Sequence, residues 1–163
     1  MAAQEGERPP EMGGAVNYSG PVRLSYRPQS DGKADAGEVV WAWVSYDDDP
    51  SIGKDRPLIL IGWTGDRRHA ALMLSSRDHD GDRRWMPIGK GTWDREGRQS
   101  WVRVDRMLAI APTAVRREGA ILPRRTFNAI VSTLQTDPEL SGRIVRKRPG
   151  LFGRLRSMMR RSP

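Results

Sequence analysis

The chain has 163 residues, which suits one domain with appended ends, because a single core usually serves about 100 to 200 residues. It has no cysteine, which excludes disulfides, thiolate nucleophiles and cysteine-ligated zinc, and two histidines leave little material for a metal centre. The net charge of +8 comes from residues 143–163, which hold eight basic and no acidic side chains, whereas residues 36–142 hold sixteen and fifteen. A nucleic-acid site in the middle of the chain must therefore depend on where individual arginines are placed.

The first 35 residues are rich in Gly, Pro, Ser and Glu, and we expect a flexible arm that is disordered or loosely docked. Only Val22, Leu24 and Tyr26 alternate in the manner of a short strand. Glu5 and Glu7 stand where a signal peptide would have a basic start, and no apolar run approaches the roughly 20 residues that span a bilayer. We therefore expect a cytoplasmic protein without a membrane span.

The middle of the chain predicts strands first. Residues 38–46 are β-branched and aromatic, which is typical of a buried strand. Turn formers and charges at 47–55 predict an exposed loop, and Arg56–Pro57 then opens an apolar strand over residues 58–63. Further strands are predicted after a tight turn at 64–66, over residues 70–74, 85–88 and 100–107, the last two being separated by a polar loop at 89–97.

Helical signals come last. Residues 112–119 predict a single helical turn closed by glycine, and residues 123–134 predict a helix whose apolar stripe is Phe127, Ile130, Val131 and Leu134. Strands followed by a terminal helix indicate a mainly β, α+β fold, a small barrel or sheet closed by the helix, and not alternating βαβ units. We expect an arm over 1–35, a barrel domain over 36–135 and a basic tail over 136–163.

The tail interleaves arginines with apolar residues such as Leu151, Phe152 and Leu155. Two interpretations are open: a solvated disordered tail, or a basic amphipathic helix that folds on an acidic partner, a membrane or RNA.

Three motifs resemble the MazF/PemK toxin family in order and spacing. They are Gly37-Glu38-Val39-Val40-Trp41-Ala42-Trp43-Val44, Gly53-Lys54-Asp55-Arg56-Pro57-Leu58-Ile59-Leu60-Ile61 and Leu72-Met73-Leu74-Ser75-Ser76. Residues 100–106 and 119–122 are similar to the family's final strand and helix region, so the resemblance covers about residues 36–134.

The resemblance implies an SH3-like barrel that forms a homodimer, cleaves single-stranded RNA without metal or cofactor, and is neutralised by a cognate antitoxin protein. The expected products are a 2′,3′-cyclic phosphate and a 5′-hydroxyl. By position, Arg56 matches the family's catalytic arginine and Ser75 its catalytic threonine or serine. One departure is Ser51, which stands five positions before the arginine where many members have an acidic residue, so Asp47, Asp48, Asp49 or Asp55 would have to substitute, or catalysis is weak.

The chemistry of these residue types agrees in part with the reaction that the resemblance implies. Attack of a ribose 2′-hydroxyl on its phosphate builds charge on the phosphoryl oxygens, which a positioned guanidinium and a hydroxyl donor stabilise. These residues do not explain proton transfer, because the pKa of arginine is too high for it to be an efficient base. His79, which lies between two aspartates, is an auxiliary candidate, and its alternative is a solvent-exposed loop histidine without a role.

The remaining candidates also have structural alternatives. Ser76 and Asp55 are auxiliary candidates, and Lys54, Arg77 and Trp93 are candidates for binding RNA. Arg56 could instead form a structural ion pair with Asp55 or Asp49. Trp93 sits in a polar loop and could stack on a base or dock onto the barrel, whereas tryptophans inside strands are more often core residues.

Three functions compete at this point. The first is the endoribonuclease toxin. The second is a module on the same fold that binds RNA or protein without cleavage, consistent with Ser51 replacing the acid. The third is a membrane- or ribosome-associated factor that acts through its basic tail.

Overall fold

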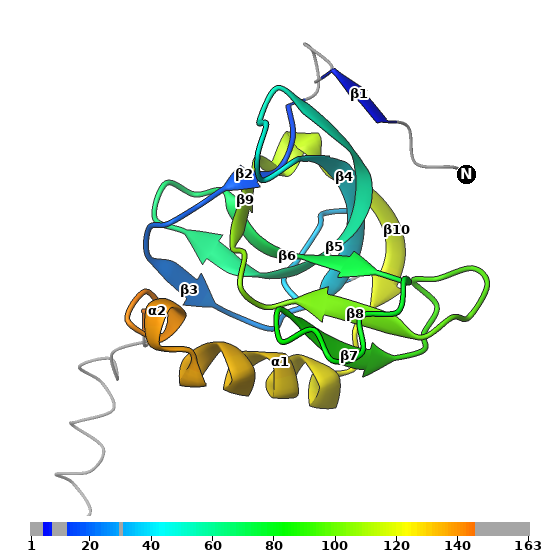
Figure 1. Ribbon diagram of the computed structural model, residues 1–163. Coiled ribbons are helices and arrows are strands. Elements are labelled where there is room, and N and C mark those ends of the chain that lie inside the picture. The colour runs from blue at the N-terminus through cyan, green and yellow to red at the C-terminus, as the bar shows by residue number, and fades with distance from the viewer. Residues whose placement is uncertain (1–4, 8–12, 30, 146–163) are drawn as a thin grey trace, which may run out of the picture.

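The computed structural model of the protein describes residues 5–7, 13–29 and 31–145. Its centre is an antiparallel sheet in which β10, β4, β5, β6, β8 and β7 neighbour one another in that order (Figure 1). The elements are β1 (Glu5–Glu7), β2 (Val16–Asn17), β3 (Val22–Leu24), β4 (Glu38–Ser45), β5 (Ile52–Thr64), β6 (His69–Ser75), β7 (Trp85–Gly89), β8 (Ser100–Arg103), β9 (Leu108–Ile110), η1 (Pro112–Ala114), β10 (Arg116–Ile121), α1 (Arg124–Thr136) and α2 (Pro138–Ser141). The predicted mainly β fold with a C-terminal helix is confirmed.

The hairpin of β4 and β5 forms the central pair of strands in the sheet. Its register runs without interruption from Val39↔Ile59 to Ser45↔Gly53. A side chain on Gly53 would collide with the carbonyl oxygen of Val44, so glycine is required for this close approach. Because the hairpin continues to Gly53, the predicted loop over residues 47–55 is wrong in its second half, and Arg56 lies inside a strand.

The sheet curls around a small core, which we call the inner core. β9 pairs with both β6 and β2, and a parallel bridge from Ala15 to Val44 brings the N-terminal segment back to β4. No ladder between the described strands closes this curl into a complete barrel. The inner core consists of Ala15, Val40, Ala42, Val44, Leu58, Leu60, Ala71, Met73, Leu108, Ile110 and Ala114.

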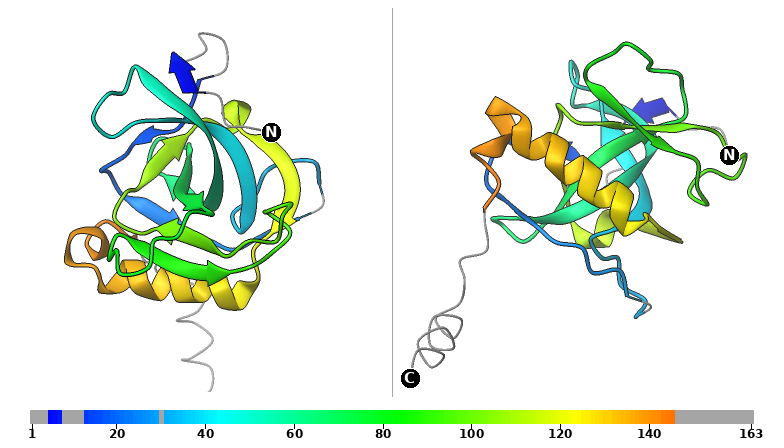
Figure 2. Two further views of the ribbon diagram at one scale, coloured as in Figure 1. Left: turned by 45° about the vertical axis from the view of Figure 1, so that its right-hand side comes forward. Right: turned by 90° about the horizontal axis from the view of Figure 1, so that it is seen from below.

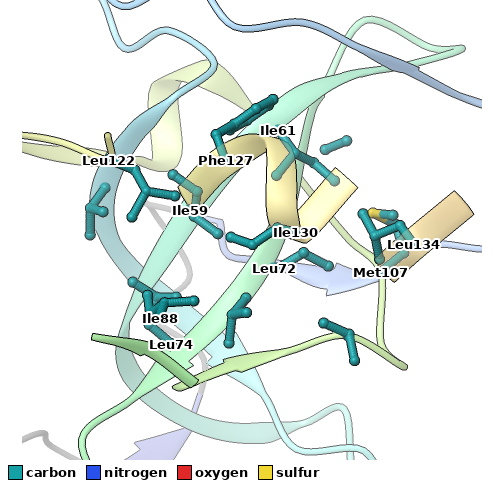
Figure 3. Close-up of a cluster of buried hydrophobic side chains, with 14 of the residues drawn as sticks. Ile59, Ile61, Leu72, Leu74, Ile88, Met107, Leu122, Phe127, Ile130 and Leu134 are labelled. Carbon is teal, nitrogen blue, oxygen red and sulfur yellow. The ribbon is translucent and has the colours of Figure 1, made fainter. Parts of the chain in front are cut away.

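Helix α1 covers the outer face of the same sheet (Figure 2). Phe127, Ile130 and Leu134 recur at helical spacing and are buried, so the predicted apolar stripe is confirmed. They pack against strand residues such as Ile59 and Leu72 (Figure 3). No helix among the described residues is long and apolar enough to cross a membrane.

The segments at both ends take part in the fold more than the sequence predicted. Residues 13–29, assigned to a flexible arm, supply β2, β3 and the buried side chains of Ala15 and Val22. The backbone N–H of Val22 donates to the carbonyl of Arg143 and that of Val145 donates to the carbonyl of Val22, both at 2.8 Å. Residues up to 145 are therefore part of the packed structure. The tail from residue 146, with its two interpretations, lies outside the described residues.

Two predicted elements are corrected. The helical turn over residues 112–119 is limited to η1, and the following residues form β10, which pairs with the edge of β4. The strand over residues 100–107 ends at Arg103 and resumes as β9. In both places pairing with a distant strand overrides the local pattern.

Candidate active site

Arg56 and Ser75 lie on neighbouring strands and share one face of the sheet. The ladder between β5 and β6 ends at Leu58↔Met73, and Arg56 and Ser75 each lie two residues beyond this last pair. Leu58 and Met73 belong to the inner core, and side chains alternate along a strand, so Arg56 and Ser75 follow on the inner-core face. The structure thus places the two predicted catalytic residues on the same face of neighbouring strands.

The hydroxyl of Ser75 has two polar neighbours. The Nε2 atom of His79 lies 3.0 Å from Ser75 Oγ, within hydrogen-bond distance. The backbone N–H of Arg77 donates to the same oxygen at 3.2 Å. His79, an auxiliary candidate in the sequence, is therefore in direct contact with Ser75.

Two tryptophans hold the imidazole of His79. Its ring is stacked on Trp85 with centroids 3.8 Å apart and planes inclined by 9°, and it meets Trp101 edge-on at 6.2 Å. The side chain is partly buried, which argues against a fully solvent-exposed loop histidine, and its role in catalysis stays a prediction. Burial lowers the pKa of His79 below its usual 6.5, and the nearby carboxylate of Asp82 opposes that shift. The imidazole is therefore mainly neutral at neutral pH, with one nitrogen able to accept a proton.

The short connection from β6 to β7 positions His79. The carbonyl of His79 accepts a hydrogen bond from the backbone N–H of Asp82 at 3.0 Å. Gly81 has a φ of 78°, a left-handed conformation that favours glycine. The Arg84 side chain donates to both carboxylate oxygens of Asp82, at 3.0 and 2.8 Å, and lowers the pKa of Asp82 to about 2. These local bonds order the loop that carries the histidine.

Arg106 is a buried arginine that is influenced by the charge of Arg56. Arg106 donates to the carbonyl of Ser45 at 2.7 Å and to the side-chain oxygen of Asn17 at 2.6 Å, and it forms an ion pair with Asp47 at 2.6 Å. Burial lowers the pKa of the Arg106 guanidinium, Asp47 raises it, and the positive charges of Arg103 and Arg56 lower it further. Arg56 therefore lies within electrostatic reach of Arg106.

The residues of β5 before Arg56 divide between the two faces. Asp55 forms an ion pair with Arg116 at 2.7 Å and alternates with Arg56, so it lies on the opposite face. Lys54, two residues before Arg56, shares the face of Arg56. In the preceding loop, Asp49 accepts a hydrogen bond from Ser51 Oγ at 2.6 Å, which lowers the pKa of Asp49. Of the candidate replacement acids, Asp47 is the one that the structure places beside the arginines of this site.

The other predicted binding residues lie elsewhere or at the margin. Ser76 and Arg77 are exposed just after β6. Trp93 donates its indole N–H to Ser100 Oγ at 3.0 Å and packs against the core beneath α1. These contacts favour docking over base stacking for Trp93, and the structure does not bring it to Ser75.

Sequence reasoning missed the part of the site that comes from β7 and β8. Trp85 and Trp101 were interpreted as core residues, and Arg103 and Arg106 were given no role. In the structure Trp101 is opposite Ser75, and Arg103 is opposite Trp85. The alternation of Trp101 and Arg103 along one strand was the available signal, because residues two apart share a face.

The arrangement is suited to an anionic ligand. It combines guanidinium groups, one hydroxyl and one mainly neutral imidazole. These groups lie on or just after the neighbouring strands β5, β6 and β8. Guanidinium groups bind phosphate oxygens, and a neutral imidazole can take a proton from a hydroxyl. Among the described residues, no group of three or more His, Cys, Asp or Glu is placed to hold a metal ion.

Fold and site together define a small curled β protein with a cluster of basic and polar side chains on neighbouring strands. A family model of the PemK-like, MazF-like toxins of type II toxin–antitoxin systems matches residues 35–136, and the chain belongs to this family. The match confirms the resemblance seen in the sequence motifs and implies a cognate antitoxin. Searches of curated proteins and of solved structures gave no match.

Proposed function

We propose that the protein is an endoribonuclease toxin that cleaves single-stranded RNA without a metal ion and leaves a 2′,3′-cyclic phosphate and a 5′-hydroxyl. The observation that carries the proposal is the 3.0 Å contact between Ser75 and a mainly neutral His79, on the face that also bears Arg56. Membership of a toxin family supports the same function.

Each side chain has a defined part in this reaction. The 2′-hydroxyl attacks the adjacent phosphorus and passes its proton to His79 through the Ser75 hydroxyl. The new bond joins O2′ to phosphorus, and the bond to O5′ breaks as that oxygen takes a proton from water. Arg56 stabilises the negative charge that develops on the phosphoryl oxygens.

The protein should act as a homodimer whose site is covered by the antitoxin when the toxin is silent. A second function, an RNA- or protein-binding module without cleavage, is favoured by Ser51, which stands where many family members have an acidic residue. The same experiment separates the two functions.

The test is incubation of purified protein with mixed RNA in the presence of a chelator. Cleavage there, with cyclic phosphate ends, is the expected result. Arg56→Ala and Ser75→Ala should each reduce the rate by roughly 10²- to 10³-fold, the usual effect of removing one stabilising donor. Ser132→Ala and Arg125→Ala are matched controls, because both residues are exposed and lie on α1. Binding without cleavage would support the module, and full activity of the two principal variants would refute the site.

A further inference from the structure

Three charged residues beside the candidate active site form a cluster that the proposed reaction does not use. Asp47 Oδ1 lies 2.6 Å from Arg106 Nε, and Asp47 Oδ2 lies 2.9 Å from Arg103 Nη1. We call Asp47, Arg103 and Arg106 the Asp47 clamp. Each carboxylate oxygen is thus held by a guanidinium from a different arginine.

The two arginine side chains are mostly buried, whereas the carboxylate is more exposed. The side chains of Arg103 and Arg106 are 15% and 8% exposed, and that of Asp47 is 43% exposed. Arg106 is also held by Ser45 and Asn17, and Arg103 forms a second ion pair with Asp105 at 2.7 Å. If Asp47 moved away with its exposed loop, both guanidinium groups would keep these bonds and their positions.

The clamp lines a shallow groove that is open to solvent. The groove has a volume of about 290 Å³, and its other lining residues are Asn17, Tyr18, Asp105, Met107 and Arg143. Guanidinium groups bind carboxylate and phosphate oxygens with the same geometry, so the Asp47 carboxylate stands in the position that a phosphate would take.

Arg103 connects the groove to the strands of the candidate active site. Arg103 follows Trp101 by two residues on β8, or about 7 Å along a strand, and it is paired with Trp85. These are the two tryptophans that hold His79. The positive charge of Arg56 also acts on Arg106.

We propose that Arg103 and Arg106 form a subsite for an RNA phosphate that flanks the cleaved one, and that the Asp47 carboxylate occupies this subsite in the free protein. The inference rests on the proposed function for the identity of the ligand. Binding of RNA then requires the loop between β4 and β5 to release Asp47. Asp47 lowers the affinity for RNA, and Arg103 raises it.

The test measures binding of a short single-stranded RNA with 2′-O-methyl riboses, which cannot be cleaved through its 2′-oxygen. Asp47→Asn should tighten binding by up to about fivefold, the upper end of the range for a partly exposed ion pair. Asp48→Asn removes the same charge from the next position of the same exposed loop and should change the affinity by less than about twofold. Arg103→Gln should weaken binding and reduce the salt slope by about one phosphate contact.

The decisive comparison is the double variant. In the Arg103→Gln background, Asp47→Asn should lose part of its effect, because the two changes act on one subsite and Arg106 still binds the other oxygen of Asp47. Equal effects of Asp47→Asn and Asp48→Asn would overturn the proposal, since they would show only general charge repulsion. Weaker binding by Asp47→Asn, with unchanged thermal unfolding, would also overturn it and make Asp47 a positioning residue.

Cleavage of unmodified RNA separates this proposal from the proposed function. An Asp47-dependent gain in binding without any cleavage would leave the subsite standing and refute the nuclease. Cleavage without the gain in binding would support the nuclease and overturn the subsite.

Discussion

Replacement of His79 by phenylalanine tests the contact at the centre of the candidate active site. Phenylalanine keeps an aromatic ring on Trp85 but lacks the Nε2 atom that lies 3.0 Å from Ser75 Oγ. His79→Ala removes both the ring and the nitrogen. Comparison of the two variants therefore separates the stacking contribution from the proton acceptor.

The expected stability changes follow from these contacts. Loss of the hydrogen bond costs about 0.5 to 1.5 kcal/mol, so His79→Phe should lower the free energy of unfolding by that amount. Loss of the stacked pair adds about 0.5 to 1.5 kcal/mol, so His79→Ala should lose about 1 to 3 kcal/mol. Urea unfolding at neutral pH measures both values.

The two variants should differ in stability but not in their rate of RNA cleavage. Both variants should cleave RNA roughly 10²- to 10⁴-fold more slowly, because both lack the proton acceptor. In the unaltered protein, cleavage should fall as the pH drops through the pKa of His79, which burial places below 6.5, because only the neutral ring accepts a proton. Initial rates over a pH series test this. Full activity of His79→Phe, or an unchanged acid limb in its profile, would refute the role of His79.

Three further outcomes are expected. Burial lowers the pKa of His69 below 6.5, so the unfolded chain binds a proton more readily than the folded chain. The free energy of unfolding should therefore be at its full value above about pH 6.5 and should decline as the pH falls. His69→Phe should reduce this decline in urea unfolding, and an unchanged pH dependence would contradict the assignment. Residues 146–163 hold seven basic and no acidic side chains, and their removal should weaken binding to RNA of any sequence. The binding should also depend less on salt, and the cleavage motif should not change. Equal salt slopes for the full and shortened chains would show that the tail does not touch RNA. Light scattering at tens of micromolar should show a homodimer, because β10 is an edge strand of the sheet and leaves Ile121 46% exposed, and a strict monomer would argue against a shared RNA groove.

The sequence by itself determined the elements whose signals are local. Continuous β-branched and aromatic residues defined β4, and an apolar stripe at helical spacing defined α1. The Gly53 to Ile61 motif indicated the family and made Arg56 a candidate, and its glycine is required where β5 passes the carbonyl of Val44. These features depend on residues close together in the chain, so a single sequence reveals them.

Only the tertiary structure decided the features that need a distant partner. Residues 116–121 form a strand because the edge of β4 accepts them, although their own pattern indicated the end of a helical turn. His79 contacts Ser75 because Trp85 and Trp101, from two later strands, hold its ring. Asp47 meets Arg103 and Arg106 across more than 50 residues of chain. Alternation along a strand shows which residues share a face, but which strands lie side by side is determined by how the whole sheet packs.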